Sequence, residues 1–466
     1  MSQPSSALNE HAAIKDSHSE EYGPIKGSLS AGRIAMIWLA ANLVVTTLLT
    51  GTLFVPGVSW QLALTLILAG TAIGTVVLVI VGNMGTRTGL STMSLTKGAF
   101  GLRGSFLTTT ANVVILMGWC WVQAILAGVT INFLVEQYTG YSNPILFSIL
   151  CQTFVVGLAI LGHEGISKVE PWLALIILAI MIYIFAVVFN AYSITDLMAL
   201  EVDAGLGWDA SIVIDVVIAT AISWTVLSAE FNRLAKSQKA GVIGSSLGYI
   251  TSTVLSMSLG ATAIAYIALE GNAINSFDPI SIVTAFGAPF AIVIFLSVMA
   301  TNTMVVYGMV ASVVNITPSS KIKFLPTAVI LGLVSIIGAS WLAMLDLFTT
   351  FLTLVGTLFI PVFAIMIADY YIIKKGYYNK DILLGRGGRY WYQKGFNVCA
   401  IVVWLLGVLV SLWLTNSIQS PLGVTIPTFV FSFLAYLGWM LVTKKQSLKK
   451  VQSTHLASSI LDNRGL

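Results

Sequence analysis

The sequence predicts an all-α membrane protein with about 12 transmembrane helices, because its composition and its long apolar runs both require a lipid solvent. Of its 466 residues, 57% are hydrophobic and only 9% are charged, whereas a soluble domain carries about 25% charged residues. A soluble fold of this length has too little interior to bury so much apolar surface. The formal net charge of +4 is too small to indicate binding to nucleic acid.

Twelve apolar runs approach or exceed the length of about 20 residues that a helix needs to cross the hydrocarbon core. We expect an N-terminal tail at residues 1–31, a transporter domain at 32–443 and a C-terminal tail at 444–466. In chain order the runs are Ile34–Val55, Gln61–Val81, Phe106–Leu134, Ile145–Leu161, Trp172–Ala191, Ser211–Ala229, Val242–Leu269, Ile282–Val314, Leu325–Ala343, Leu347–Ile373, Phe396–Leu414 and Val424–Val442.

Basic residues fall in alternate loops between these runs, as expected when Lys- and Arg-rich loops stay in the cytoplasm. No Lys or Arg lies in a loop predicted to be outside, and one miscounted helix would destroy this separation. The pattern predicts a multi-pass plasma-membrane protein with both termini cytoplasmic. The basic residues of the predicted inside loops are Arg87, Lys97, Arg103, Lys168, Arg233, Lys236, Lys239, Lys321, Lys323, Lys374, Lys375, Lys380, Arg386, Arg389 and Lys394.

Motifs of soluble enzymes are absent from the sequence. It contains no Walker A sequence, no HExxH, no GxSxG and no cluster of metal-ligating residues. The three cysteines, Cys120, Cys151 and Cys399, lie singly inside apolar runs and are expected to be buried thiols. We therefore expect neither enzymatic activity nor a bound cofactor.

Polar residues interrupt the first and sixth apolar runs without introducing a charge. At mid-depth, Asn, Ser, Thr and Gly can satisfy backbone groups that a local helix break sets free. The alternative is ordinary hydrogen bonding and close packing between helices. The interrupting residues are Asn42, Thr46, Thr47, Thr50 and Gly51 in the first run, and Thr220, Ser223, Trp224 and Thr225 in the sixth.

The spacing of the two interruptions suggests an internal repeat. A unit of five helices is odd, so a second unit must enter the membrane from the opposite side and form an inverted repeat. We expect runs 1–5 and 6–10 to be these repeats, with substrate held where the broken helices meet. Runs 11 and 12 would then be peripheral.

The third run contains residues suited to a flat, neutral ring. Trp119 and Gln123 are four residues apart and share one helical face. An indole can stack on a ring while an amide pairs with the ring edge, and Trp224 of the sixth run could cover the opposite face of the ring. The alternative is that these tryptophans pack the bundle or lie at the lipid interface.

The eighth run contains oxygen ligands suited to a small cation. Ser297 and Thr301 share one face, and Asn302 adds an amide beside it. Carbonyl groups exposed by a break in the first run would complete such a site. Packing between helices through Ser and Thr is the alternative.

Several segments, taken in order, resemble the nucleobase:cation symporter family 1, and most closely its cytosine and purine-cytosine permease branch. The first run contains AAN followed by TT and GTL, the loop after the second run contains GTRTGLST and FGLRGS, and the third run contains GW. SWTVLSAEFNR, TNTMVVYG and IADYY follow in runs six, eight and ten. The resemblance extends from about Trp38 to about Asp369.

The resemblance implies a core of two inverted five-helix repeats with two peripheral helices, and alternating access driven by a cation gradient. It implies that the base stacks on Trp119 and hydrogen-bonds Gln123. It further implies that the break in helix six binds substrate at Ser223 and Trp224, and that Asn302 on helix eight corresponds to an asparagine of the cytosine permeases.

For sodium, the resemblance implies a site formed by backbone carbonyls at Ala40, Leu43 and Ser297 and by two adjacent hydroxyl side chains. The two hydroxyl positions match Ala300 and Thr301, so one hydroxyl is lost here. That loss argues for protons, yet the core stretches of helices one, three and eight contain no titratable group. Sodium, which needs only oxygen ligands, is therefore favoured over the proton as the coupling cation. Glu230 also replaces the usual Asp of the family.

The expected function is cation-coupled import of a nucleobase or a similar planar heterocycle, such as cytosine or a purine, across the plasma membrane. Hydantoin, a hydroxymethyl-pyrimidine or another small solute is the alternative substrate. An amino-acid transporter would need groups for a carboxylate and an ammonium, and a channel would need pore-lining rings; the sequence shows neither. The expected partners are the small substrate and the lipid bilayer, with no nucleic acid, and the oligomeric state stays open.

Overall fold

The structure, a computed structural model, describes residues 24–161, 164–287, 289–314, 322–384, 388–417, 420 and 422–462. Residues 1–23 of the predicted N-terminal tail, and the predicted inside-loop residues Lys321 and Arg386, lie outside this part. Within it the regular structure is helical, apart from two isolated β-bridges. The chain divides into two compact units: Met1–Ser94 with Phe106–Gly356, and Leu95–Ser105 with Thr357–Leu466.

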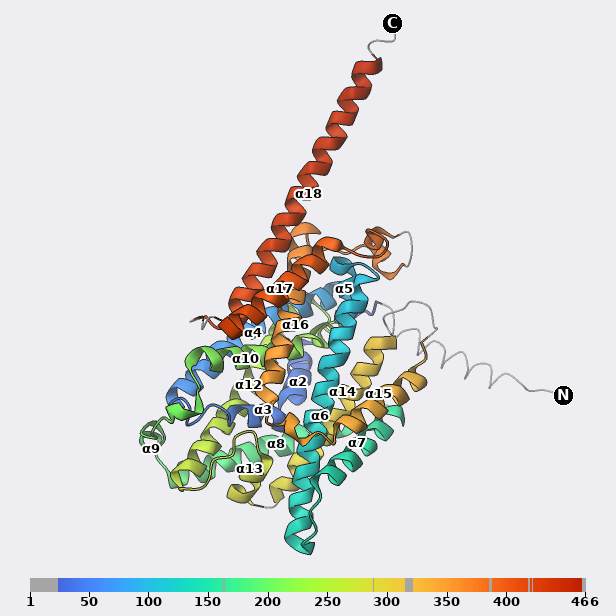
Figure 1. The fold of residues 1–466 in the computed structure, drawn as a ribbon. Helices are drawn as coiled ribbons and strands as arrows, with labels where there is room; N and C mark the ends of the chain where they lie inside the picture. Colours follow the sequence, from blue (N-terminus) through green and yellow to red (C-terminus); the bar gives the residue numbers. More distant parts are fainter. Residues whose placement is uncertain are drawn as a thin grey trace, which may run out of the picture. The chain divides into compact units, whose positions relative to one another are not determined.

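The helices of the first unit are drawn in Figure 1. They are α2 (Ala31–Asn42), α3 (Val45–Gly51), α4 (Trp60–Thr88), α6 (Gly104–Thr139), α7 (Pro144–Leu161), α8 (Glu164–Ala191), α9 (Ile194–Met198), η1 (Ala204–Leu206), α10 (Ala210–Thr225), α11 (Ser228–Asn232), α12 (Gln238–Leu269), α13 (Pro279–Phe286), α14 (Pro289–Val314), α15 (Phe324–Gly338) and η2 (Leu342–Met344). Helices α5 (Thr92–Phe100), α6 and α16 (Phe348–Ile367) contribute residues to both units.

The described helices are those of a multi-pass membrane protein. Seven of them are long and apolar enough to cross a membrane, or eight if the bent pair α2 and α3 forms one span. Four shorter apolar helices, at Pro144–Ile160, Leu175–Ala191, Ala210–Thr225 and Phe324–Gly338, overlap further predicted runs. The all-α membrane fold is therefore confirmed, while the count of about twelve spans stays a prediction.

The predicted break in the first run is present. Helices α2 and α3 meet at an angle of 67° across Leu43 and Val44. The buried side chain of Asn42 holds the break, because its Nδ2 donates to Ser252 Oγ at 3.1 Å and to Thr253 Oγ1 on α12. Its Oδ1 accepts a hydrogen bond from Thr47 Oγ1 at 3.1 Å. The same amide thus joins both halves of the broken helix to a third helix.

The sixth run is also interrupted where the sequence predicts. Helix α10 ends at Thr225 and the short helix α11 begins at Ser228. Across the gap, Ser228 Oγ donates to the backbone carbonyl of Thr225 at 2.8 Å. Two interrupted helices, five runs apart, are consistent with inverted repeats, and the repeat assignment itself stays a prediction.

The eighth run differs from the prediction of one continuous helix over Ile282–Val314. Helix α13 ends at Phe286 and α14 begins at Pro289. Gly287 lies between them with φ of 108°, in the region of positive φ that favours glycine. Proline has no N–H to continue a helix but fits the first position of the next one. The Gly287–Pro289 segment was therefore the boundary signal that the long apolar run concealed.

Small residues bring α3 and α12 into close contact. A Cβ atom at Gly260 would overlap the carbonyl oxygen of Leu48, and one at Gly51 would overlap that of Met257. Gly51 was one of the residues that marked the first run as unusual. Close approach of two backbones through glycine is a common way to pack helices in a membrane, where no hydrophobic effect drives helices together.

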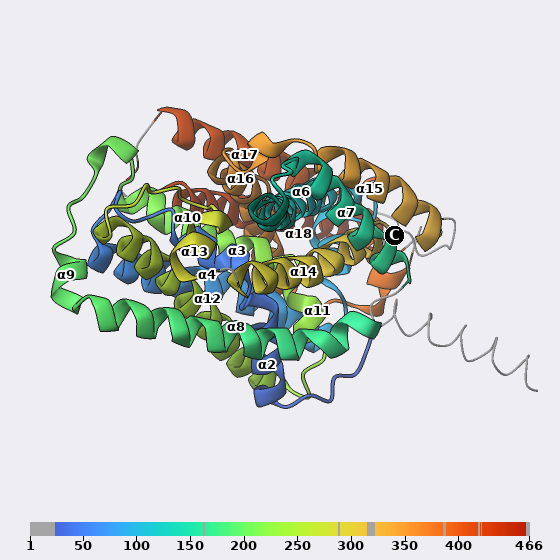
Figure 2. The ribbon, with the colours of Figure 1, turned by 90° about the horizontal axis from the view of Figure 1, so that it is seen from below.

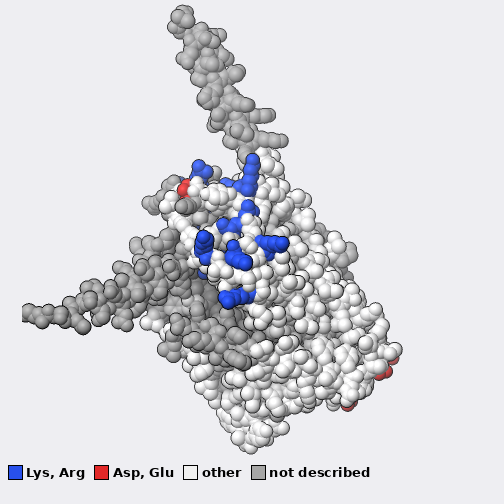
Figure 3. Space-filling model, turned by 180° about the vertical axis from the view of Figure 1, so that it is seen from behind, with Lys and Arg blue, Asp and Glu red and all other residues white. Residues whose placement is uncertain are grey.

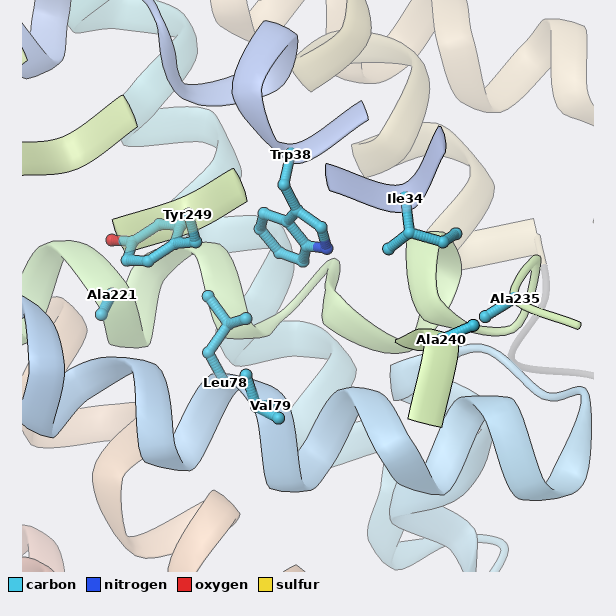
Figure 4. Close-up of a cluster of buried hydrophobic side chains, with 8 residues drawn as sticks. All are labelled: Ile34, Trp38, Leu78, Val79, Ala221, Ala235, Ala240 and Tyr249. Atoms are coloured by element: carbon cyan, nitrogen blue, oxygen red, sulfur yellow. The ribbon is translucent and has the colours of Figure 1, made fainter. Parts of the chain in front are cut away.

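Trp38 forms the centre of a buried cluster in the first unit (Figure 4). Its side chain has no exposed surface, and its Nε1 donates to Asn232 Oδ1 on α11 at 3.0 Å. Its ring meets those of Phe231 and Tyr249 edge-on, with centroids 5.2 and 5.8 Å away. Trp38 thereby fixes α2 against both α11 and α12.

Helix α14 packs against α7, α8 and α15. Figure 2 shows α8 extended beside α12 and α14. The residues that line the site described below come from α3, α6, α10, the gap after α10 and α14, and all of these residues belong to the first unit.

The second unit contains η3 (Ala368–Ile373), η4 (Lys380–Leu383), η5 (Arg389–Trp391), α17 (Val398–Ser417) and α18 (Thr425–Asp462). The predicted C-terminal tail thus continues α18 as far as the structure describes it. At its core, the fully buried Asp369 carboxylate accepts hydrogen bonds from Tyr436 at 2.8 Å and Tyr378 at 2.9 Å. Asn397 donates to Tyr436 OH at 3.2 Å and to the Ala99 carbonyl at 2.6 Å. A buried carboxylate with two phenol donors is well satisfied.

Candidate substrate cavity

A cavity of about 40 Å³ lies between α3, α6, α10 and α14. A single buried water needs about 10–15 Å³, so the cavity has room for more than one water. Four predicted substrate residues and one predicted cation ligand line it. The lining residues are Thr46, Thr47, Thr50, Leu116, Trp119, Gln123, Thr220, Ser223, Trp224, Val226, Leu227, Thr301 and Val305.

The indole of Trp119 is held from two sides. Its Nε1 donates to Ser223 Oγ at 2.7 Å, which joins α6 to the end of α10. Its ring meets Phe348 and Phe351 edge-on, with centroids 5.8 and 5.4 Å away. Edge-to-face pairs favour one ring orientation. These contacts therefore hold the Trp119 indole in one orientation in the cavity wall.

Gln123 contributes an unsatisfied acceptor beside Trp119. Its side chain is 3% exposed, and within the described residues its Oε1 has no hydrogen-bond partner. Leaving a buried amide oxygen unpaired costs about 1–3 kcal/mol. An N–H group of a bound ligand would remove this cost, which is the edge-reading role that the sequence predicts for Gln123.

Trp224 connects the cavity with the Trp38 cluster. It lies one residue before the end of α10 and lines the cavity. Its ring meets that of Trp38 edge-on at 6.4 Å. Its predicted position over the opposite face of a bound ring stays a prediction.

Several threonine hydroxyls around the cavity donate their hydrogens to other protein groups. Thr50 donates to the Thr46 carbonyl at 2.8 Å, Thr220 to the Val216 carbonyl at 2.9 Å, and Thr47 to Asn42 Oδ1. A hydroxyl that donates in this way keeps only acceptor capacity. Because the described residues of the lining carry no charge, the cavity suits a neutral ligand that carries N–H donors.

Asn302 does not line this cavity. Its Nδ2 donates to Gln152 Oε1 on α7 at 2.7 Å and to the Cys120 carbonyl on α6 at 3.3 Å. Gln152 in turn donates to Ser335 Oγ on α15 at 2.8 Å. In this structure the Asn302 amide is bound to Gln152 and does not reach the cavity, so its predicted contact with substrate stays a prediction. The sequence analysis did not single out Gln152. Only the fold brings together residues this far apart in the chain.

The four predicted sodium ligands are distributed over α2 and α14. Ala40 lies in the last turn of α2, where carbonyl groups lack partners within the helix, and Leu43 is the residue at the break. Thr301 Oγ1 donates to the Ser297 carbonyl at 3.0 Å, and Ser297 Oγ is buried without a partner in the described part of the chain. These oxygens have the hard-ligand chemistry that sodium needs, and their joint coordination of an ion stays a prediction.

Glu230 joins two segments of the first unit through hydrogen bonds. Its carboxylate accepts hydrogen bonds from Thr92 Oγ1 at 2.7 Å and from the Thr92 N–H at 3.2 Å, at the start of α5. Glu230 therefore attaches α11 to the segment that follows α4.

Some lining residues were not predicted. Leu116 lies three residues before Trp119, and Val305 lies four residues after Thr301. Residues three and four apart share a helical face, so this spacing was the available signal. Val226 and Leu227 occupy the gap between α10 and α11, and an apolar side chain in a break gives no distinct pattern.

Comparison with known proteins gives the family. The family described as "Permease for cytosine/purines, uracil, thiamine, allantoin" matches residues 30–441. The allantoin permease of Bacillus subtilis is 24% identical over 436 residues, covering 84% of this chain and 85% of that protein. The cytosine permease of Escherichia coli K12 is 23% identical over 367 residues, covering 76% and 81%. The purine-uracil permease of Arabidopsis thaliana is 24% identical over 407 residues, covering 81% and 67%.

Among solved structures, the fold is similar to that of Mhp1, a nucleobase-cation-symport-1 family transporter. Its closed conformation with bromovinylhydantoin bound gives a TM-score of 0.76 at 19% identity and covers 91% of this chain and 95% of that one. Its inward-facing conformation gives 0.78 at 18% identity and covers 92% and 94%. The family match over most of the chain and the shared fold lead to one conclusion: this chain belongs to the nucleobase:cation symporter family 1, the permeases for cytosine, purines and related solutes.

Proposed function

We propose that this protein is a secondary active transporter that imports a nucleobase or a similar planar heterocycle, such as cytosine or a purine, together with a cation. The observation that carries the proposal is the uncharged cavity in which Trp119, Gln123, Ser223 and Trp224 meet. An aromatic face, an unpaired amide oxygen and hydroxyl acceptors match a flat, neutral ring with N–H groups.

The broken helices support transport by alternating access. Transporters with inverted repeats hold substrate beside discontinuous helices near the bilayer midplane. Here α3, which follows the first break, and α10, which precedes the second, both line the cavity. The similarity to Mhp1 in closed and inward-facing conformations supports the same reading, because that transporter adopts more than one state.

We favour sodium as the coupling cation, and a plasma-membrane location with cytoplasmic termini. Oxygen atoms at the break of α2, together with Ser297 and Thr301 on α14, support a sodium site. The segregation of basic loops supports the orientation.

Hydantoin, allantoin, a hydroxymethyl-pyrimidine or another small heterocycle is the second candidate class of substrate. It is supported by similarity to the hydantoin permease of Microbacterium maritypicum, which is 21% identical over 393 residues, covering 81% of this chain and 80% of that protein. The uncharged lining does not favour an amino acid, whose carboxylate and ammonium groups would need partners.

The test is a competition experiment with the purified protein in sealed proteoliposomes. Uptake of radiolabelled cytosine or adenine is measured against unlabelled cytosine, adenine, hypoxanthine, uracil, hydantoin, allantoin and a hydroxymethyl-pyrimidine. We expect saturable uptake at micromolar substrate and competition by at least one of these rings. Flux that never saturates, or indifference to every ring in the panel, would exclude the proposal.

A further inference from the structure

An open surface cavity of about 490 Å³ lies in the second unit, and its lining shares no residue with the candidate substrate cavity. Its lining combines two cations with apolar side chains and one amide, and it contains no acidic residue. The lining residues are Arg103, Gln393, Lys394, Phe396, Val398 and Ile401.

The two cations are exposed, and no described carboxylate forms an ion pair with either of them. The ion pair of 4.0 Å between Arg389 and Asp381 involves neither of these cations, and neither of its residues lines the cavity. The Arg103 guanidinium lies 5.3 Å from the ring centroid of Trp391, which supports it without neutralising it. Lys and Arg side chains gather on one part of the face seen in Figure 3, with few acidic side chains among them. The local potential is therefore positive.

Backbone hydrogen bonds hold the segments that carry Arg103 and Lys394 next to each other. The N–H groups of Arg103 and Gly104 both donate to the Gly395 carbonyl, at 2.7 and 3.2 Å. Lys394 and Gly395 have φ of 54° and 97°, a tight turn that allows this approach. The residues just before α6 are thus bound to the loop before α17, and Arg103 and Lys394 are presented together.

The apolar part of the cavity belongs to the start of a membrane span. Phe396 and Val398 are 38% and 46% exposed, and Val398 is the first residue of α17. Arg103 immediately precedes α6, and both α6 and α17 are apolar enough to cross a membrane. The cavity therefore lies at the level where apolar spans enter the polar headgroup region.

We propose that this cavity binds one anionic phospholipid, with the phosphate at Arg103 and Lys394 and an acyl chain along Phe396 and Val398. Basic pockets at the ends of membrane helices are suited to anionic headgroups. The apolar side chains distinguish a lipid from free phosphate, which would gain nothing from them. The proposal does not depend on the identity of the transported solute.

The experiment measures lipid binding to the full-length protein in neutral detergent by native mass spectrometry. Dioleoylphosphatidylglycerol, dioleoylphosphatidylcholine and inorganic phosphate are added separately. We expect phosphatidylglycerol to bind more tightly than phosphatidylcholine. The double variant Arg103→Gln/Lys394→Gln should weaken phosphatidylglycerol binding about 30-fold, which corresponds to about 1 kcal/mol for each cation.

Lys375→Gln/Arg389→Gln is the matched control, because it removes two positive charges of the same unit that do not line the cavity. It should retain most of the preference for phosphatidylglycerol. Val398→Trp, which fills the apolar part and leaves both cations, should also abolish tight lipid binding, and it decides the matter if the double variant fails to fold. Equal loss in the control, unchanged binding by Val398→Trp, no preference between the lipids, or displacement of phosphatidylglycerol by millimolar phosphate would each overturn the proposal.

Discussion

Trp119 Nε1 donates a hydrogen bond of 2.7 Å to Ser223 Oγ, and this bond joins the middle of α6 to α10 two residues before that helix ends. Two side chains that the sequence assigns separately to substrate therefore form one unit. We therefore expect Ser223 to affect a bound ligand through the indole that it orients.

Replacing Trp119 tests whether a ring stacks on it. Trp119→Ala should weaken substrate binding by about 1–3 kcal/mol, the range for a base on an aromatic side chain, and Trp119→Phe should retain part of the affinity. Equilibrium binding of labelled substrate to purified protein is the measurement. Unchanged affinity of Trp119→Ala, with the protein present in the membrane at its normal level, would place the site elsewhere.

Replacing Ser223 tests the hydrogen bond itself. Ser223→Ala should lower substrate affinity about fivefold, since a typical hydrogen bond contributes about 1 kcal/mol, and Ser223→Thr should restore most of it. In a Trp119→Phe background, which lacks the indole N–H, the same alanine change should have little further effect. Additive losses in this double-mutant cycle would show that Ser223 acts independently of Trp119.

The two amides near the cavity should behave differently. Gln123→Ala should change which bases compete for uptake, because its unpaired oxygen is available to a ring edge. Asn302→Ala should mainly lower the free energy of unfolding, by about 1–3 kcal/mol, because it leaves Gln152 Oε1 without its donor in a buried network. Gln152→Ala is the comparison and should resemble Asn302→Ala. If Asn302→Ala, but not Gln152→Ala, changes the order in which bases compete, Asn302 contacts the substrate.

The coupling ion can be tested at Ala300, the position at which the sequence resemblance implies that a hydroxyl ligand is lost. Uptake should fall when sodium is replaced by choline at constant pH. Ala300→Ser should lower the sodium concentration needed for half-maximal uptake, because it supplies an additional oxygen near Thr301. Uptake that is indifferent to sodium but abolished by a protonophore would assign the proton instead.

Topology can be tested with single cysteines. The three native cysteines are free and buried, so surface labelling should report the introduced residue. Cysteines at Asp203 and Lys375, both exposed, should react with an impermeant maleimide from opposite sides of the membrane. Labelling of both from the same side would reject the predicted arrangement of spans. Arg386, in the same predicted loop as Lys375, lies outside the described residues.

The sequence predicted a helix break where one polar side chain stands out in an apolar run. Asn42 in an apolar run marked the break in the first helix, and it is the residue that holds both halves. The long eighth run was misleading, because apolar residues continue through Gly287 and Pro289 and conceal the boundary between α13 and α14.

Within the site, the sequence identified residue types but not their partners. Trp119, Gln123, Ser223 and Trp224 line one cavity as expected. The bond between Trp119 and Ser223 joins residues 104 positions apart, and that between Asn302 and Gln152 joins residues 150 positions apart. Such pairings depend on how helices cross, which helical periodicity does not encode.

The described residues that line the candidate cavity carry no charge, and this bears on the electrical balance of the proposed transport. A neutral substrate in an uncharged cavity carries no charge of its own, so with one coupling cation each turnover would move one positive charge inward. A membrane potential of about 100 mV contributes about 2.3 kcal/mol to such a step, which corresponds to roughly fifty-fold accumulation of substrate. Uptake would then appear as an inward current that grows with hyperpolarisation, even without a sodium concentration gradient.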